Sequence, residues 1–264
     1  MKNILLEIFE NKLLENAEAQ KKISLPEMKH LAANSNHTAN SFIKAIEAKT
    51  RANQPALIAE IKKKSPSKGI IRQNFEPVEI ARAYEAAGAT CLSILTDEKF
   101  FAGKNEYLQE VKKISKLPIL RKDFIINEYQ IYQTKALGAD CLLLIMSILK
   151  PSEAITLEKT AHDLGLDVLI EVHTEKELEQ ALKLKSKLIG INNRNLDTFE
   201  VSLDIGKNLA KLIPGGYIKI CESGIYKNSE ILYMMDHGFS GFLVGESLMR
   251  EADIEAATKK LLGT

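Results

Sequence analysis

The sequence has no tryptophan, three cysteines and no long apolar run. The lack of tryptophan excludes nothing, but the longest apolar run, from Cys141 to Met146, falls far short of the about 20 residues that cross a bilayer. The first residues lead into a stretch rich in Glu and Lys rather than into an apolar signal segment. The net charge of +1 provides no basic surface for nucleic acid or membrane. We therefore expect a cytoplasmic protein with no membrane or nucleic-acid partner.

Sequence motifs that bind metal ions or nucleotides are also missing. Cys91, Cys141 and Cys221 each lie in an apolar run, as small buried side chains do in a reducing compartment, and none has a CxxC partner or a histidine at ligand spacing. No GxGxxG follows the first strand pattern and no P-loop motif occurs, so neither a zinc site nor a nucleotide site is expected. Of five scattered histidines, His173 alone lies near a candidate catalytic residue, Glu171, and its place in a turn favours a structural role.

A repeated unit is present. Three segments share a helical pattern, a glycine that supplies a left-handed C-cap (Gly88, Gly138 or Gly238) and an apolar strand soon after. Eight strand patterns, each followed by a helical one, cover residues 56–62, 91–96, 119–122, 141–145, 167–172, 188–192, 217–221 and 241–244. Strict alternation predicts a parallel sheet, and eight units predict the α/β class with a closed (β/α)8 TIM barrel. An open doubly wound sheet is the alternative.

The length of 264 residues fits one barrel domain over 1–264, of which about 1–50 forms an N-terminal helical extension. We expect this extension to cap the barrel floor or to reach over its mouth, and simple packing is favoured over a direct catalytic role. Residues 34–38 are expected to form a mobile linker. The Met1 start and a helical finish at Leu262 favour a stand-alone monomer.

Charged residues end several strand patterns. Because strand side chains alternate between faces, Glu60 and Lys62 point into the barrel while Leu57, Ala59 and Ile61 face the helices. The same alternation sends Arg121 and Lys219 outward and places a further set inside: Lys122, Glu171, Asn192 and Glu222. Barrel active sites lie at the carboxyl ends of strands, and a lysine flanked by carboxylates in a partly dry cleft suits proton transfer. The pattern predicts an acid–base site, with a structural ion-pair network as the alternative.

Two turns near the end of the chain predict an anion site. Ser223-Gly224 follows the seventh strand and Gly245-Glu246 follows the eighth, where a short helix is expected to start. The loops after strands seven and eight are the usual phosphate site of such barrels. The basic loop 62–69 after the first strand is either a solvated loop or a mobile lid that brings Lys or Ser to the phosphate.

Taken together, six motifs resemble the indole-3-glycerol-phosphate synthase family of tryptophan biosynthesis, in order from about residue 55 to 250. They are 59–67 (AEIKKKSPS), 95–101 (LTDEKFF), 120–124 (LRKDF), 170–173 (IEVH), 190–194 (GINNR) and 222–225 (ESGI). One departure is Asn195, where the family pattern has Asp. The resemblance implies a carboxy-lyase that closes the ring of 1-(2-carboxyphenylamino)-1-deoxyribulose 5-phosphate, a sugar-phosphate substrate, without a metal or organic cofactor.

The resemblance also implies roles. Lys122 is the first choice for the proton donor to the ketone, Lys62 and Glu171 are candidates for the second acid and base, and Glu60 would orient or charge a lysine. The substrate-binding residues would be Ser65, Phe101, Phe124, Asn192, Arg194, Glu222, Ser223, Gly224, Leu243, Gly245 and Glu246. Within that set, Asn192 and Arg194 would hold the anthranilate carboxylate. Two rival interpretations are a Schiff-base aldolase that uses Lys122 and a phosphate-ligand sensor on the same barrel.

Overall fold

The computed structural model describes residues 4–35, 40–195 and 198–264. Within these ranges eight parallel strands close into a barrel: β1 (Ala56–Ile61), β4 (Cys91–Leu95), β5 (Ile119–Lys122), β6 (Cys141–Ile145), β7 (Asp167–Val172), β8 (Leu188–Asn192), β9 (Ile218–Glu222) and β10 (Gly241–Val244). β1 pairs with both β4 and β10, which closes the sheet. The predicted barrel is confirmed, and the open doubly wound sheet is excluded.

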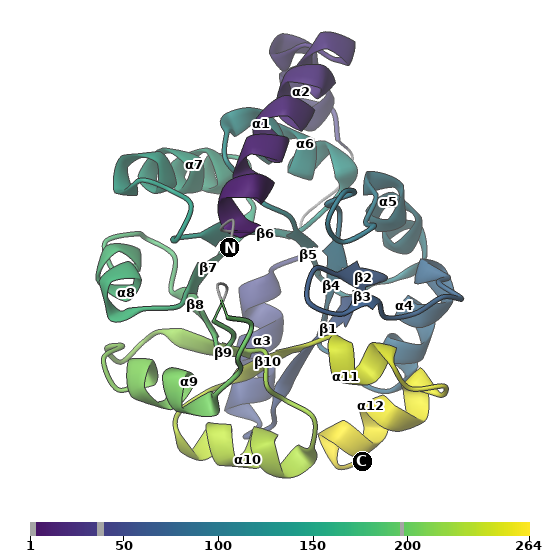
Figure 1. Ribbon diagram of the computed structural model, residues 1–264, viewed down its shortest axis with the longest axis vertical. Coiled ribbons are helices and arrows are strands. Elements are labelled where there is room, and N and C mark those ends of the chain that lie inside the picture. The colour runs from purple at the N-terminus through teal and green to yellow at the C-terminus, as the bar shows by residue number, and fades with distance from the viewer. Residues whose placement is uncertain (1–3, 36–39, 196–197) are drawn as a thin grey trace.

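Helices alternate with these strands and surround the barrel (Figure 1). They are α4 (Pro77–Ala86), α5 (Asn105–Ile114), α6 (Glu128–Leu137), α7 (Pro151–Asp163), α8 (Glu175–Ala181), α9 (Leu203–Ala210), α10 (Asn228–Asp236), α11 (Glu246–Met249) and α12 (Ile254–Leu262). The predicted glycine caps are left-handed, with φ of 90° at Gly88, 88° at Gly138 and 84° at Gly238. None of the helices in the described ranges has both the length and the apolar character needed to cross a bilayer.

The strand boundaries differ slightly from the predicted ones. β1 ends at Ile61 and β4 at Leu95, each one residue early, and β9 covers 218–222 instead of 217–221. Glu222 is therefore the last residue of a strand rather than part of the turn after it. The basic loop after β1 contains a short antiparallel pair, β2 (Lys64–Ser65) with β3 (Gly69–Ile70), which the sequence had not indicated.

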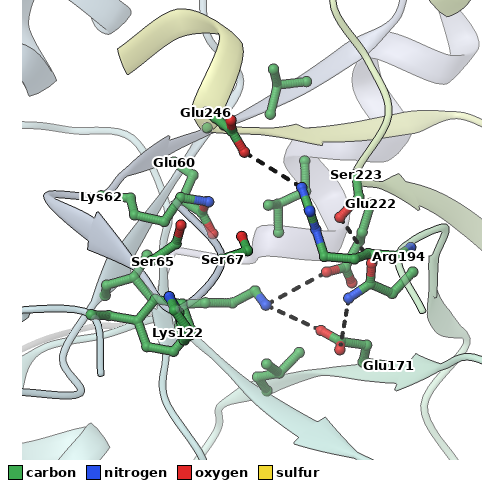
Figure 2. A pocket seen from close by; sticks show the side chains of 18 of the residues that line it. Glu60, Lys62, Ser65, Ser67, Lys122, Glu171, Arg194, Glu222, Ser223 and Glu246 are labelled. Atoms are coloured by element: carbon green, nitrogen blue, oxygen red, sulfur yellow. Dashed lines mark hydrogen bonds and ion pairs between the residues drawn. The ribbon is translucent and has the colours of Figure 1, made fainter. Parts of the chain in front are cut away.

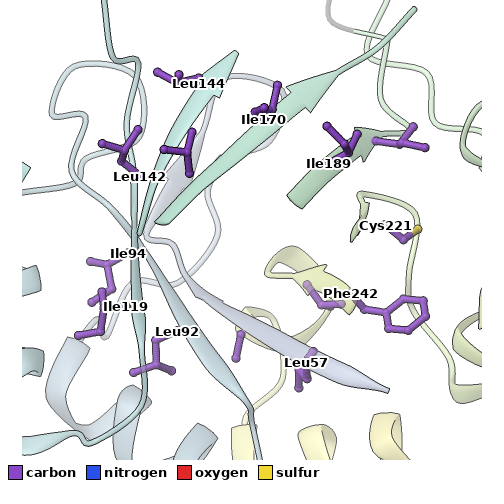
Figure 3. Close-up of a cluster of buried hydrophobic side chains, with 14 of the residues drawn as sticks. Leu57, Leu92, Ile94, Ile119, Leu142, Leu144, Ile170, Ile189, Cys221 and Phe242 are labelled. Carbon is purple, nitrogen blue, oxygen red and sulfur yellow. The ribbon is translucent and has the colours of Figure 1, made fainter. Parts of the chain in front are cut away.

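The predicted alternation of side chains is confirmed. Leu57, Ala59 and Ile61 lie in the buried layer between strands and helices, and Figure 3 shows outward-facing neighbours in this layer, such as Leu92 and Ile119. A second buried cluster fills the barrel interior and includes Ile58, Leu120, Leu169 and Ile220. All three cysteines are buried in these layers.

The charged side chains that point away from the barrel interior have polar partners. Arg121 is buried and donates to Thr96, Thr134 and the carbonyl of Gln130. Lys219 donates to the carbonyl of Ala210 at 3.0 Å.

The N-terminal extension occupies both ends of the barrel. It contains α1 (Ile4–Lys22), α2 (Leu25–Ala33) and α3 (Phe42–Arg51). Phe42 and Ile46 of α3 belong to the interior cluster, and α3 lies behind the barrel in Figure 1, so this helix closes the floor. The start of α1 lies over the opposite end (Figure 1). Of the predicted linker 34–38, residues 36–38 lie outside the described residues.

Candidate active site

A pocket opens at the carboxyl ends of the strands, and Figure 2 shows its charged side chains converging. It contains about 1180 Å³ of empty space, part of it open to solvent. Every site residue predicted from the sequence lines it: Glu60, Lys62, Ser65, Phe101, Lys122, Phe124, Glu171, Asn192, Arg194, Glu222, Ser223, Gly224, Leu243, Gly245 and Glu246. The barrel therefore brings together residues that are far apart in the sequence.

Lys122 lies at the end of β5 between two carboxyl groups. Its Nζ is 3.1 Å from Oε2 of Glu171 on β7 and 3.6 Å from Oε2 of Glu222 on β9 (Figure 2). Burial alone would lower the pKa of Lys122, but the nearby charges of Glu171, Glu222 and Glu60 outweigh it and raise the pKa above its ordinary value. The ammonium group is thus protonated at neutral pH and is able to donate a proton.

Glu171 and Glu222 are neighbours, and their pKa values are shifted in opposite directions. Burial alone would raise the pKa of Glu171, yet the charges of Lys122 and His173 and a hydrogen bond from Asn192 lower it to about 2. Burial and the adjacent Glu171 carboxylate raise the pKa of Glu222 well above its usual range. Two carboxyl groups that share one lysine do not both ionise readily. Glu171 therefore ionises more readily than Glu222, which releases its proton less readily than an ordinary glutamate.

A second acid–base pair lies across the pocket. Glu60, at the interior end of β1, accepts a hydrogen bond from Nζ of Lys62, which follows the strand. Both side chains are largely buried, at 5% and 16% exposure. Glu60 also contributes to the raised pKa of Lys122. Two lysines with carboxylate partners therefore face one pocket.

Polar groups of β8 and β9 form one hydrogen-bonded wall. Asn192 donates from Nδ2 to Oε1 of Glu171 at 3.1 Å, and its Oδ1 accepts from Ser223 at 2.9 Å and from the backbone of Arg194 at 3.1 Å. The guanidinium of Arg194 lies 3.4 Å from Oε2 of Glu246 at the start of α11. The carboxylate of Glu246 thus turns toward Arg194, and also toward Arg250 at 3.1 Å.

Small residues that line the pocket lie in the segments after β1 and β9. Ser65 is buried, and its Oγ has no hydrogen-bond partner among the described residues. Ser223 and Gly224 both adopt left-handed backbone, with φ of 64° and 88°. A buried hydroxyl without a partner is costly unless a ligand supplies one. This side of the pocket therefore suits a polar or anionic group.

The remaining wall is apolar. The rings of Phe101 and Phe124 lie with centroids 6.0 Å apart, and Leu243 lies at the end of β10. Lining residues that the sequence analysis missed include Ile4, Leu5, Ile8, Leu95, Leu143, Ile145, Phe199 and Tyr226. Continued alternation along β6 would have indicated Leu143 and Ile145, but nothing in the sequence says that α1 supplies part of the wall.

A buried lysine fixes α1 in this position. Lys12 is 3% exposed, and its Nζ lies 2.9 Å from both Oδ2 of Asp97 and Oδ1 of Asp123, in the segments that follow β4 and β5. Glu15 of the same helix completes the set at 2.6 Å. The helix that contributes Ile8 to the pocket is therefore tied to strand ends that adjoin Lys122.

Comparison with known proteins shows the family to which the chain belongs. The family model described as indole-3-glycerol phosphate synthase matches residues 5–261. The chain is 47% identical over 265 residues to the protein of that name from Polynucleobacter necessarius subsp. necessarius (strain STIR1), covering 99% of each chain. It is 48% identical over 261 residues to the one from Neisseria meningitidis serogroup B (strain ATCC BAA-335 / MC58), covering 99% of this chain and 100% of the relative. The chain belongs to the indole-3-glycerol phosphate synthase family. The resemblance and the carboxy-lyase class predicted from the motifs are thereby confirmed.

Solved structures support the fold alone. Tryptophan synthase subunit alpha from Legionella pneumophila str. Paris superimposes with a TM-score of 0.65 at 14% identity, covering 86% of this chain and 98% of that one. A 3-hexulose-6-phosphate synthase gives 0.64 at 16% identity, covering 79% and 98%. At such identities the likeness extends to the barrel and not to the reaction.

Proposed function

We propose that this member of the indole-3-glycerol phosphate synthase family closes the indole ring of 1-(2-carboxyphenylamino)-1-deoxyribulose 5-phosphate by lysine and glutamate acid–base catalysis. The observation that carries the proposal is the position of Lys122. Its protonated amine lies between Glu171 and Glu222 in a pocket that has one apolar and one polar side. The substrate likewise has an aromatic ring at one end and a phosphate at the other.

The first step joins a ring carbon to the ketone carbon. The electron pair of the carbonyl bond moves to the ketone oxygen, and Lys122 donates the proton that this oxygen needs. Loss of CO2 then returns the electron pair of its bond to the ring and restores aromaticity. Lys122 is the candidate donor because its amine is protonated and faces the pocket from the end of β5.

The second stage removes water. The hydroxyl formed from the ketone leaves with a proton, and a base removes another proton from nitrogen or carbon. Lys62 and Glu171 are the candidates for this acid and base, and Glu60 would orient Lys62 through their hydrogen bond. Glu171 is a candidate base because its carboxylate is ionised at neutral pH and lies 3.1 Å from Lys122 in the pocket.

Binding would use both sides of the pocket. Phe101, Phe124 and Leu243 would enclose the aromatic ring, while Asn192 and Arg194 would hold its carboxylate. The phosphate would lie against Ser65, Ser223, Gly224, Gly245 and the backbone of Glu246. Arg194 contacts Glu246 in this structure, so binding of the carboxylate requires the guanidinium to exchange one anionic partner for another. The cytoplasmic location, the monomeric state and the single-domain organisation stay predictions.

The test is a cyclisation assay that follows indole fluorescence with the purified protein and this substrate. We expect turnover, and we expect Lys122→Met to lower kcat by roughly 10² or more, the scale of a lost general acid, with circular dichroism unchanged. Binding of substrate without a fluorescence gain would favour the sensor. A covalent adduct trapped by borohydride would favour the Schiff-base aldolase, and near-normal turnover of Lys122→Met would contradict its role as the acid.

A further inference from the structure

One titratable side chain beside the pocket has no part in the steps above. His173 follows β7, two residues after Glu171, and its side chain is 11% exposed. Its ring lies between two carboxylates. Nδ1 is 3.3 Å from Oε2 of Glu177, and Nε2 is 3.3 Å from Oε1 of Glu171. Simple packing does not account for such a position.

Glu177 fixes where the ring lies. It belongs to the first turn of α8, and its Oε2 accepts the backbone N–H of His173 at 2.7 Å in addition to facing the ring. The backbone N–H of Glu177 in turn donates to Thr174, the N-cap of that helix, at 3.2 Å. The start of α8 is therefore linked through Glu177 and His173 to the carboxylate at the end of β7.

The contact with Glu171 is electrostatic. Nε2 of His173 is buried and has no aligned hydrogen-bond partner among the described residues, so charge rather than a directed bond joins it to Oε1. A neutral imidazole has one N–H and one lone pair, and either tautomer would turn a lone pair toward a carboxylate. Only the imidazolium presents an N–H to both Glu171 and Glu177. The two carboxylates therefore favour the charged ring.

We propose that His173, held by Glu177, is a positioning residue that keeps an imidazolium against Oε1 of Glu171 and so holds this carboxylate in place for proton transfer. Lys122 holds the other oxygen, Oε2, at 3.1 Å, and Asn192 shares Oε1. Glu171 is thus fixed from β5, β8 and α8 at once. The inference rests on the proposed function, because it presupposes that Glu171 transfers a proton.

Charges around the ring support this assignment. Burial and the positive charge of Lys122 would lower the pKa of His173, but the hydrogen bond to Glu177 and the charges of Glu171 and Glu177 outweigh them and raise the pKa above its ordinary value. A group whose pKa is raised on folding keeps its full effect below the ordinary value, about 6.5, and loses it as pH rises through the raised value. The contribution of His173 should therefore be complete below about pH 6.5 and fade as the pH rises through the raised pKa.

The experiment compares His173→Gln with wild type in the cyclisation assay across pH. Removing a partner that orients a functional group typically costs about 10- to 100-fold, so we expect kcat to fall by at least about tenfold near pH 6 with KM little changed. The ratio of wild-type to variant kcat should shrink as pH rises, because the wild-type ring then loses its charge. His162→Gln, an exposed histidine on α7, is the matched control and should keep wild-type activity.

Two further variants separate the possible outcomes. Glu177→Gln removes one of the charges that hold the proton on His173, so its kcat should begin to fall at lower pH than that of wild type, even if His173→Gln does not fold. Glu171→Gln, measured in parallel, should lose more activity than either. Full activity of Glu171→Gln would overturn the proposed role of Glu171 itself. A large loss in Glu171→Gln beside normal kcat in His173→Gln, or a loss that is the same at every pH, would overturn only the positioning role.

Discussion

Two glycines leave space that carboxyl groups of the candidate site occupy. A β carbon at Gly190 on β8 would lie 2.1 Å from Oε1 of Glu222, and one at Gly245 after β10 would lie 2.3 Å from Oε2 of Glu60. Neither glycine has a φ in the left-handed region, so backbone freedom is not the reason for them. What matters at both positions is the missing side chain. The glycines allow Glu222 and Glu60 to lie close to the barrel wall.

We expect Gly190→Ala to impair catalysis more than folding. The added methyl group would displace the carboxyl group of Glu222, which lies 3.6 Å from Lys122, and so disturb the charges that hold the lysine. A displacement of about 1 Å near reacting groups costs up to about a hundredfold in rate, so kcat in the cyclisation assay should fall tenfold or more. Gly215→Ala is the control, since a β carbon there meets no atom within 4 Å and its φ is not left-handed. Equal kcat for the two variants would show that Glu222 needs no such space.

The sequence predicted the charged residues of the site but not what surrounds them. Strand alternation placed Lys122 and Glu171 in one pocket because the period of two residues is a local property of any strand. The contact between Gly190 and Glu222 depends on a side-chain rotamer, which local pattern does not specify. The same holds for Arg194, whose guanidinium faces Glu246 in this structure. The sequence thus predicts which face of a strand a side chain points to, but not which side chains it contacts there.

At the scale of elements, α1 is a part of the pocket wall that is held by charge. Its exposed side chains include Leu6 and Leu14, so apolar burial along the helix is incomplete, and the buried Lys12 provides a specific attachment. Burial alone would lower the pKa of Lys12, but Asp123 and Asp97 outweigh it and raise the pKa above its ordinary value. Removal of one partner from a buried ion pair leaves the others uncompensated.

Lys12→Met should therefore destabilise the protein by about 3–5 kcal/mol, the usual cost of breaking a buried pair on one side. Urea unfolding measures this loss. Because α1 contributes Ile4, Leu5 and Ile8 to the pocket, KM in the cyclisation assay should also rise. Lys21→Met is the matched control: Lys21 lies on the same helix, is 71% exposed and pairs only with Glu18 among the salt bridges of the described residues. Unchanged stability and KM in Lys12→Met would mean that α1 is held by other contacts.

The elements themselves were largely predictable. Each barrel strand carries its own signal, an apolar run after a left-handed glycine or a turn, and the eight repeated signals agree with one another. The hairpin of β2 and β3 was not predictable, because residues 64–70 contain charged and turn residues without alternating apolar positions. The sequence left open whether the N-terminal extension covers the floor or the mouth of the barrel, so the place of α1 at the mouth was not predictable. Helical periodicity shows that a helix has an apolar face but not which surface covers that face.

For the whole molecule, one segment connects three layers. Arg121, Lys122 and Asp123 are consecutive, and they point respectively into the helix layer, the pocket and α1. Asp123 also accepts from Thr96 at 2.5 Å and pairs with Arg121 at 3.2 Å. The stability of the barrel, the attachment of α1 and the position of Lys122 therefore depend on neighbouring residues of one strand end.

This arrangement predicts a specific dependence of stability on pH. Burial would raise the pKa of Asp123, but the charges of Lys12 and Arg121 lower it to about 2. A carboxyl group with a lowered pKa stabilises the fold above its unfolded pKa of about 4 and loses this effect as pH falls through about 2. The shift corresponds to on the order of 2 kcal/mol. Glu222 and Asp97, whose pKa values are raised, act in the opposite sense, so the wild-type curve alone does not isolate Asp123.

The difference in the free energy of unfolding between wild type and Asp123→Asn isolates the contribution of Asp123. The asparagine does not titrate, so the free energy of unfolding of the two proteins should differ most above about pH 5 and converge by about 2 kcal/mol as pH falls toward 2. Urea unfolding at a series of pH values measures this convergence. Asp163→Asn, at a side chain that is 62% exposed on α7, should keep a nearly constant difference from wild type. A constant difference for Asp123→Asn as well would mean that Lys12 and Arg121 do not hold this carboxylate in its ionised form.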